Sequence, residues 1–138
     1  MKIHTTNYQN TFIEVADDCP VDKAETPPMK GNKITVAYRQ FALLNEAPYK
    51  YTSDEVLFQV YANKNDLIQA EYQEACVEFF SKGQPCFRAS PLTKRYGFGI
   101  HSNEEGKIAL FGIETEEYAK FIADDSIEKV KAMRSKRK

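Results

Sequence analysis

The order of apolar and polar residues along the chain changes period several times, which predicts both strands and helices. Residues 11–16 alternate apolar and polar side chains, and this pattern predicts a short strand. Residues 21–33 contain Pro27, Pro28 and Gly31 and show no apolar period, so we expect a long loop there. From Ile34 to Leu44 the apolar residues recur at helical spacing, which predicts a helix over 34–46 capped by Asn32.

The middle of the chain contains one ambiguous segment and one clear one. Residues 56–61 are β-branched and aromatic, which favours a strand that is buried on both faces. A helix beginning at Ser53 is the competing interpretation. Next, Asp66 and Gln69 form a capping-box pattern, and Gly83 fits the end of the helix that follows. The apolar residues on one face of that helix are Ile68, Tyr72, Ala75, Cys76, Phe79 and Phe80.

The last third of the chain predicts a β-hairpin followed by two short helices. Residues 96–101 and 107–113 are typical of strands, and the five residues between them suit a hairpin loop. Thr115 is a suitable cap for one helix, with Tyr118, Phe121 and Ile122 facing inward, and Ser126 for a final one. We therefore predict an α+β fold: an antiparallel sheet with helices packed on one face.

Length and composition limit the class of protein. With 138 residues, 42% of them hydrophobic and 28% charged, the chain suits a single globular domain over residues 1–138. The longest apolar run has six residues, against the roughly 20 that span a bilayer, and the N-terminus does not look like a signal peptide. Three cysteines without a C-x-x-C pair argue against a disulfide framework. We expect a cytoplasmic protein that does not act at a membrane.

The formal net charge of −1 hides a strong asymmetry. Residues 129–138 form a basic C-terminal tail with six positive charges and no negative one, so the other 128 residues carry 13 positive against 20 negative charges. A basic tail suits nucleic acid, but the acidic body opposes it and no recognised nucleic-acid motif is present. There are two competing interpretations. The tail is a solvated helix end, or it docks on the acidic body of its own chain or of a neighbouring one.

Residues 83–101, G-Q-P-C-F-R-A-S-P-L-T-K-R-Y-G-F-G-I-H, hold the densest group of chemically capable side chains. Ser90 followed by Pro91 is typical of a helix start, and helix N-termini attract anions. With Arg88, Lys94 and Arg95 nearby, the segment could hold a phosphate or carboxylate. The alternative is that Ser90 only caps its own turn while the cations face water.

Four stretches of the chain carry a family resemblance: residues 83–101, H-T-T-N-Y at 4–8, D-D-C-P at 17–20 and the M-R-S-K-R ending. On these residues the chain resembles a family of small uncharacterised bacterial proteins, a domain of unknown function. The G-Q-P-C-F-R-A-S-P-L-T-K-R-Y-G stretch is the specific part, and the resemblance covers nearly the whole chain. It implies a stand-alone bacterial domain. It brings no activity, cofactor or catalytic residue with it.

Alternation in a strand over 96–101 would place Arg95, Gly97, Gly99 and His101 on one face. Two glycines there leave bare backbone that a ligand, a helix of the same domain or a second subunit could approach. Cys86 beside cations could be a nucleophile paired with His101, or it could be a buried inert thiol. No residues have metal-ligand spacing, and we expect neither a metal nor another cofactor.

We therefore expect a domain that binds a small anionic molecule, such as a carboxylate, in a groove formed by residues 86–101. The groove residues are Cys86, Arg88, Ser90, Lys94, Arg95, Gly97, Gly99 and His101. The alternative is a non-catalytic interaction module, either a homodimer or a nucleic-acid accessory protein that uses the basic tail. No catalytic pair can be assigned, so whether the protein is an enzyme stays open.

Overall fold

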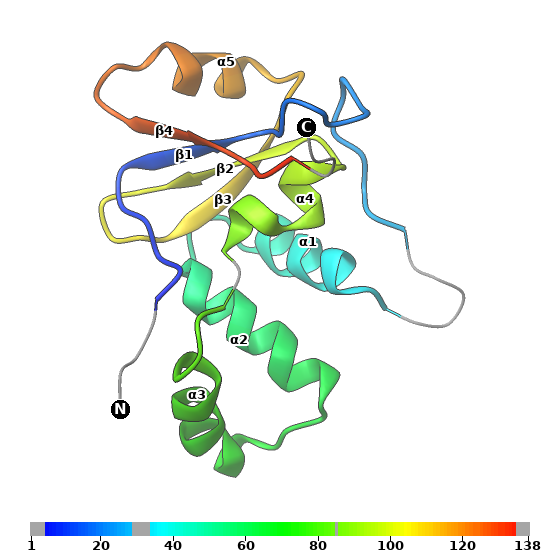
Figure 1. Cartoon of the computed structure of the whole chain (residues 1–138), viewed down its shortest axis with the longest axis vertical. Helices are drawn as coiled ribbons and strands as arrows, with labels where there is room; N and C mark the ends of the chain where they lie inside the picture. The colour runs from blue at the N-terminus through cyan, green and yellow to red at the C-terminus, as the bar shows by residue number, and fades with distance from the viewer. Residues whose placement is uncertain (1–4, 29–33, 85, 135–138) are drawn as a thin grey trace.

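A four-stranded mixed sheet forms the centre of the molecule (Figure 1). The computed structural model describes residues 5–28, 34–84 and 86–134. The strands are β1 (Thr11–Glu14), β2 (Phe98–Ser102), β3 (Ile108–Gly112) and β4 (Glu128–Lys131), in the spatial order β3-β2-β1-β4. β2 pairs antiparallel with both β1 and β3, so the predicted hairpin is confirmed.

The chain end does not form the predicted final helix. Instead β4 pairs parallel with β1, with Phe12 opposite Lys129 and Ile13 opposite Val130. The sheet is consequently mixed and not purely antiparallel. Val130 packs against the main core cluster, whereas Glu128 and Lys131 are exposed. Pairing with β1 satisfies the backbone groups of this segment, whereas an isolated helix of this length would be only marginally stable.

The α+β class is confirmed. The α-helices are α1 (Val36–Glu46), α2 (Ser53–Lys64), α3 (Tyr72–Phe80), α4 (Pro91–Lys94) and α5 (Glu116–Ala123), and the 3₁₀ turns are η1 (Gln69–Glu71) and η2 (Phe87–Ala89). α1, α2 and α4 lie on one side of the sheet and α5 on the other, so helices cover both faces (Figure 1). No helix in the described ranges is long and apolar enough to cross a membrane.

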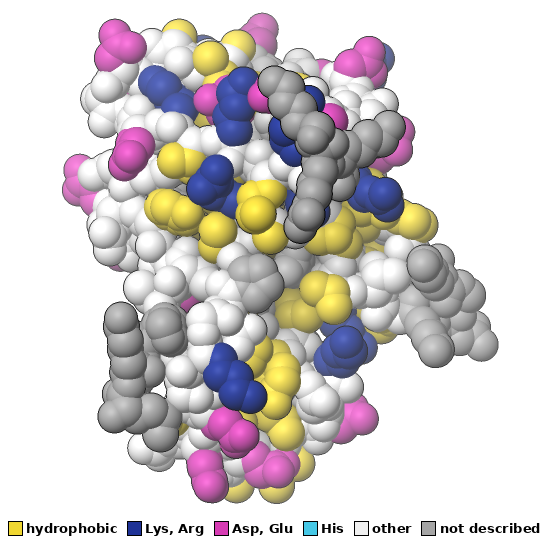
Figure 2. Space-filling view, viewed as in Figure 1, with side chains coloured by type: hydrophobic (Ala, Val, Ile, Leu, Met, Phe, Trp, Pro, Cys, Tyr) yellow, Lys and Arg dark blue, Asp and Glu magenta, His cyan; other side chains and the backbone are white. Residues whose placement is uncertain are grey.

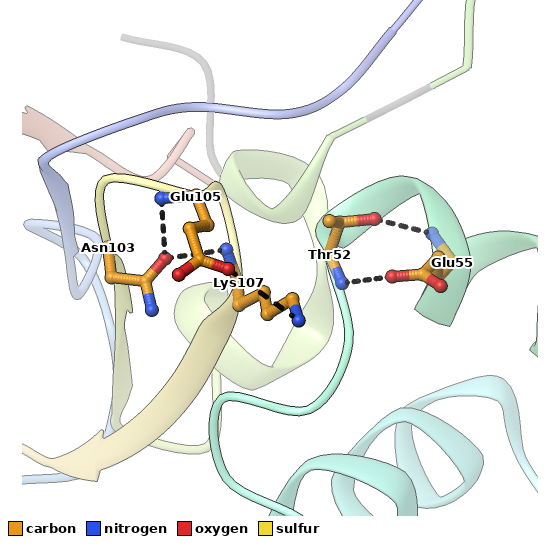
Figure 3. Close-up of polar contacts among 5 residues, drawn as sticks. All are labelled: Thr52, Glu55, Asn103, Glu105 and Lys107. Carbon is orange, nitrogen blue, oxygen red and sulfur yellow. Dashed lines mark hydrogen bonds and ion pairs between the residues drawn. The ribbon is translucent and has the colours of Figure 1, made fainter.

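Residues 56–61, predicted as a strand, lie inside α2. A capping box starts this helix: the Thr52 hydroxyl accepts from the Glu55 N–H at 3.2 Å, and the Glu55 carboxylate accepts from the Thr52 N–H at 2.9 Å (Figure 3). Val56 and Val60, one helical turn apart, are buried in the main cluster. The capping box and burial against other elements outweigh the β propensity of this segment.

The helix predicted from Asp66 begins later, at Tyr72. Asp66 has a positive φ of 53°, a left-handed conformation that is unlike the extended backbone of a helix N-cap. The turn η1 comes first, and the Glu71 carboxylate accepts from the Ile68 N–H at 3.0 Å. Most of the predicted inward face of α3 is confirmed, because Phe80 is buried with Phe58 and Ala62, while Cys76 and Phe79 pack against them. The prediction was wrong for Ile68, which precedes the helix and is 64% exposed.

The remaining helix caps and the hairpin loop form close to the positions that the sequence predicts. Thr35 caps α1 and Thr115 caps α5, each accepting a backbone N–H three residues later. Asn32, the expected cap of α1, lies outside the described residues. In the β2–β3 loop, the Asn103 side chain accepts from the N–H groups of Glu105 and Lys107 (Figure 3). This side-chain turn fixes the hairpin.

The sheet separates two core clusters. On the side of α1, α2 and α4, Ile13, Ile100 and Ile108 belong to the largest cluster. On the side of α5, Phe12 and Tyr118 are buried, and Phe111 and Phe121 pack against them. Ile122, which we expected to face inward, is 38% exposed.

Candidate functional site

The structure does not gather the eight predicted groove residues at one place. Arg88 lies in η2, and its Nε donates to the Lys131 carbonyl oxygen at 2.6 Å. The Arg88 carbonyl accepts from the Met133 N–H at 2.7 Å. Arg88 therefore holds the end of β4 against η2, a structural role that the sequence did not suggest.

Lys94 and Arg95 lie at the end of α4. Arg95 is exposed and Lys94 half-buried. Within the described residues, neither side chain makes a hydrogen bond or an ion pair, as expected if the cations face water. Ser90 caps α4, accepting from the Leu92 N–H at 3.1 Å.

The glycine face of β2 is covered by the chain itself. A Cβ on Gly99 would lie 2.4 Å from a Phe12 ring carbon and 2.7 Å from a Tyr118 ring carbon. Gly97 has a φ of +79°, and a Cβ there would lie 3.0 Å from Val21 and 3.2 Å from the Ala24 backbone. Of the three approaches considered from the sequence, close packing within the domain is the one found, and it leaves no space for a ligand or second subunit against Gly97 and Gly99.

His101 lies on the α5 side of the sheet. Its ring stacks on Phe121 with centroids 4.3 Å apart, and its Nδ1 is 2.8 Å from the Tyr49 hydroxyl. Burial lowers the pKa of His101, an effect that nearby Asp124 partly offsets, and burial raises the pKa of Tyr49. Both groups are therefore neutral near pH 7. No pattern in the sequence indicated the Tyr49 contact, and the predicted pairing of Cys86 with His101 is not formed.

Cys86 and Ser90 do share a site, a pocket of about 280 Å³ between α1, α2, the end of α3, Gln84 and residues 86–91. Its lining is mainly apolar, with a few polar groups, as in many small-molecule sites. The apolar residues that line it include Val36, Leu57, Val60, Tyr61 and Phe79. The polar ones are Gln40, Lys64, Gln84, Cys86 and Ser90.

Gln40 is the most informative polar residue of this pocket. It is only 4% exposed, and its Oε1 accepts from the Ser90 hydroxyl at 2.7 Å. Its Nε2 has no hydrogen-bond partner among the described residues, and it is not sealed from solvent. A buried amide group normally has its hydrogen bonds satisfied. The pocket thus offers a free N–H donor beside apolar walls.

Cys86 is half-buried at the opening of η2, and its Sγ lies 3.6 Å from the Tyr8 hydroxyl. Burial, followed by the contact with Cys86, raises the pKa of Tyr8. Tyr8 therefore stays protonated at neutral pH and can donate its O–H to the sulfur. The three cysteines are free thiols.

Lys64 gives the pocket its charge. It is an exposed residue in the last turn of α2 and, among the described residues that line the pocket, the only charged one. In the space-filling view, hydrophobic side chains reach the surface between α1, α2 and α3, with basic side chains beside them (Figure 2). A positive group at the edge of an apolar pocket favours a ligand with an apolar body and a negative end.

One signal in the sequence could have identified Gln40. It lies three residues after Ala37 and four before Leu44, both buried, so helical spacing puts it on the apolar face of α1. A polar residue at such a position needs a partner, and a buried amide is a candidate for function. Lys64 and Tyr8 had no comparable signal.

Other chemistry considered from the sequence finds less support. Within the described residues, no three His, Cys, Asp or Glu side chains are grouped to hold a metal. Residues 135–138 of the basic tail lie outside the described part of the chain, so its predicted binding to nucleic acid stays a prediction. Within β4, Lys131 pairs with Asp17 at 2.6 Å.

The comparisons with known proteins agree with the resemblance but add no activity. No curated protein and no solved structure matches the chain significantly. Residues 3–138 match DUF6157, a family of unknown function. The chain therefore belongs to the DUF6157 family.

Proposed function

We propose that this protein binds a small, mainly apolar carboxylate in the pocket between α1, α2, α3, Gln84 and residues 86–91. The binding of an anionic small molecule expected from the sequence is retained, but its place changes. Cys86 and Ser90 stay in the site, and Gln40 and Lys64 replace Lys94, the two arginines, the two glycines and His101.

The observation that carries this proposal is the Gln40 amide. A 4%-exposed side chain with an unpaired N–H donor at an apolar pocket suits a ligand oxygen. Hydrogen bonds to ionised acceptors are about twice as strong as neutral ones, so a carboxylate suits this donor best. Lys64 adds a positive charge at the pocket edge.

The pocket volume limits the size of the ligand. About 280 Å³ corresponds to roughly nine water molecules at ~30 Å³ each, which suits a ligand of about ten non-hydrogen atoms. Octanoate is a suitable probe, because it has a carboxylate and a flexible apolar chain of that size. We also propose a bacterial cytoplasmic setting, where free thiols such as Cys86 stay reduced.

Thermal unfolding with octanoate, octanol or octylamine tests the proposal. Octanoate at ten times its Kd should add about 1.4 kcal/mol to the free energy of unfolding, or roughly 4 °C in Tm. Lys64→Met should reduce this shift, whereas Lys82→Met, at an exposed lysine outside the pocket, should not. Gln40→Leu should also weaken octanoate binding. The Tm of this variant without ligand, measured in the same scans, shows whether the substitution itself changes stability.

Two results would contradict the proposal. In the first, octylamine raises Tm as much as octanoate, which would show that the negative end of the ligand is not recognised. In the second, the octanoate shift survives both Lys64→Met and Gln40→Leu, which would place the ligand elsewhere.

A further inference from the structure

Cys86 is a nucleophilic group at the wall of the proposed ligand pocket. Its Sγ has the Tyr8 hydroxyl at 3.6 Å, and the unpaired Gln40 donor belongs to the same lining. These two observations are independent, because one concerns the sulfur and the other an amide N–H of the mostly buried Gln40 that can donate to a ligand oxygen in the pocket. Together they provide a nucleophile and a group that can bind a carbonyl oxygen in one small apolar space.

The other two cysteines have different surroundings. Cys76 packs against Phe58 and Phe80, and burial raises the pKa of its thiol, so its thiolate is disfavoured. Cys19 packs against the cluster under α5, on the far side of the sheet from the pocket. Neither lines the pocket that holds Cys86. The chain thus contains its own comparison thiols.

We propose that Cys86 is a covalent attachment site for apolar α,β-unsaturated carbonyl compounds that enter this pocket. This inference rests on the proposed function, since the same apolar walls and Gln40 amide would hold the ligand. It adds a reactive class of ligand and a bond to a named atom.

The reaction balances without any further reactant. The Cys86 thiolate attacks the β-carbon of the ligand, and a sulfur–carbon bond forms as the carbon–carbon π bond breaks. Its electrons move toward the carbonyl oxygen, where the Gln40 N–H can donate to the developing negative charge. The proton that left the thiol then joins the α-carbon. No leaving group or oxidant is required.

Tyr8 is a positioning residue, because it acts on the ligand only through the sulfur of Cys86. Its hydroxyl can donate to Sγ, and this contact fixes the position of the sulfur at the pocket wall. Arg88 is close enough to Tyr8 to interact with it electrostatically. We expect Tyr8→Phe to slow the alkylation of Cys86 several-fold while leaving the octanoate shift in Tm unchanged. A role in packing alone would weaken both.

The test treats the full chain with oct-3-en-2-one and, as the matched control, with saturated octan-2-one. Intact-mass spectrometry should show one added oct-3-en-2-one per chain and no addition of octan-2-one. Peptide mapping should place the adduct on Cys86, with a rate about tenfold above that at Cys76. Cys86→Ser should abolish the fast adduct, and Cys76→Ser should leave it unchanged.

The outcomes separate this inference from the function on which it rests. If octanoate raises Tm but oct-3-en-2-one labels the three cysteines at equal rates, the covalent inference is refuted and the ligand pocket stands. If Cys86 reacts fast while octanoate neither raises Tm nor slows the reaction, carboxylate binding is refuted and the thiol site stands. Fast labelling of Cys86 that octanoate slows supports both.

Discussion

Gly99 offers a sharp test of how β2 packs beneath α5. A Cβ built there meets Phe12 at 2.4 Å and Tyr118 at 2.7 Å, both closer than real Cβ contacts. Both rings are buried, Phe12 at 0% and Tyr118 at 8% exposure, and their centroids lie 5.0 Å apart with the planes at 81°. Neither ring is therefore free to move aside, and we expect Gly99→Ala to be destabilising.

Two opposing effects determine the size of the loss. An alanine in a strand is favoured over glycine by about 0.5–1 kcal/mol, because glycine loses more backbone entropy on folding. Overpacking a tight core costs about 1–3 kcal/mol. The contacts are short enough for overpacking to dominate, so the free energy of unfolding should fall by about 1–2 kcal/mol. For a chain of this length, Tm should fall by roughly 3–6 °C.

Urea unfolding and thermal scans of Gly99→Ala measure this effect, and Gly83→Ala is the matched control. A Cβ on Gly83 meets nothing within 4 Å, and the residue is exposed. The same chemical change there should leave stability unchanged or raise it slightly. The difference between the two variants isolates the steric effect from the entropy of the unfolded chain.

The double variant Gly99→Ala with Phe12→Leu makes the test more specific. Leucine lacks the ring atom that lies nearest to the added Cβ, so part of the Gly99→Ala loss should be recovered in this background. We expect a favourable coupling of about 1 kcal/mol between the two sites. If Gly99→Ala proves as harmless as Gly83→Ala, the glycine face is open and our reason for excluding a ligand there fails.

Three further predictions concern Thr52 and Asp54 at the start of α2 and the half-buried imidazole of His101. Thr52→Ala removes the side-chain half of the α2 capping box and should cost about 1 kcal/mol, measured by urea unfolding; no change would show that the box contributes nothing. Asp54→Ala removes the acceptor of two Thr6 hydrogen bonds and should increase hydrogen exchange at the Thr6 N–H, whereas unchanged protection would refute its anchoring role. His101 has a lowered pKa when folded, so its unfolded form binds protons first: its contribution to stability is complete above about pH 6.5 and is lost as pH falls through the folded pKa. NMR titration of the His101 ring should give a pKa below that of a model peptide, and His101→Gln should flatten the dependence of Tm on pH in this window.

Part of the candidate site could be read from the sequence. Residues 83–101 were identified as chemically rich, and two of them, Cys86 and Ser90, line the pocket. Their partners Gln40 and Lys64 lie on helices far away in sequence, so no local motif linked them. Arg88 and His101 are equally capable side chains, but one is bound to a backbone carbonyl and the other stacks on Phe121.

Local chemistry settled several elements before any tertiary contact was known. Ser90 with Pro91 starts α4, Thr115 starts α5, and the two apolar runs around a polar loop form the β2–β3 hairpin. Each signal lies within a few residues of the structure it specifies. A cap or a turn satisfies backbone groups next to it, so its effect depends little on the rest of the chain.

The tertiary structure decided whatever depended on a distant partner. β4 is a strand because β1, more than a hundred residues earlier, offers it backbone groups to pair with. Residues 56–61 suit either a helix or a strand, and packing of Val56 and Val60 against the sheet favours the helix. The glycine face and the pocket also depend on which distant side chains meet there. Packing of segments far apart in the chain is a property of the whole fold, so neither composition nor period could reveal it.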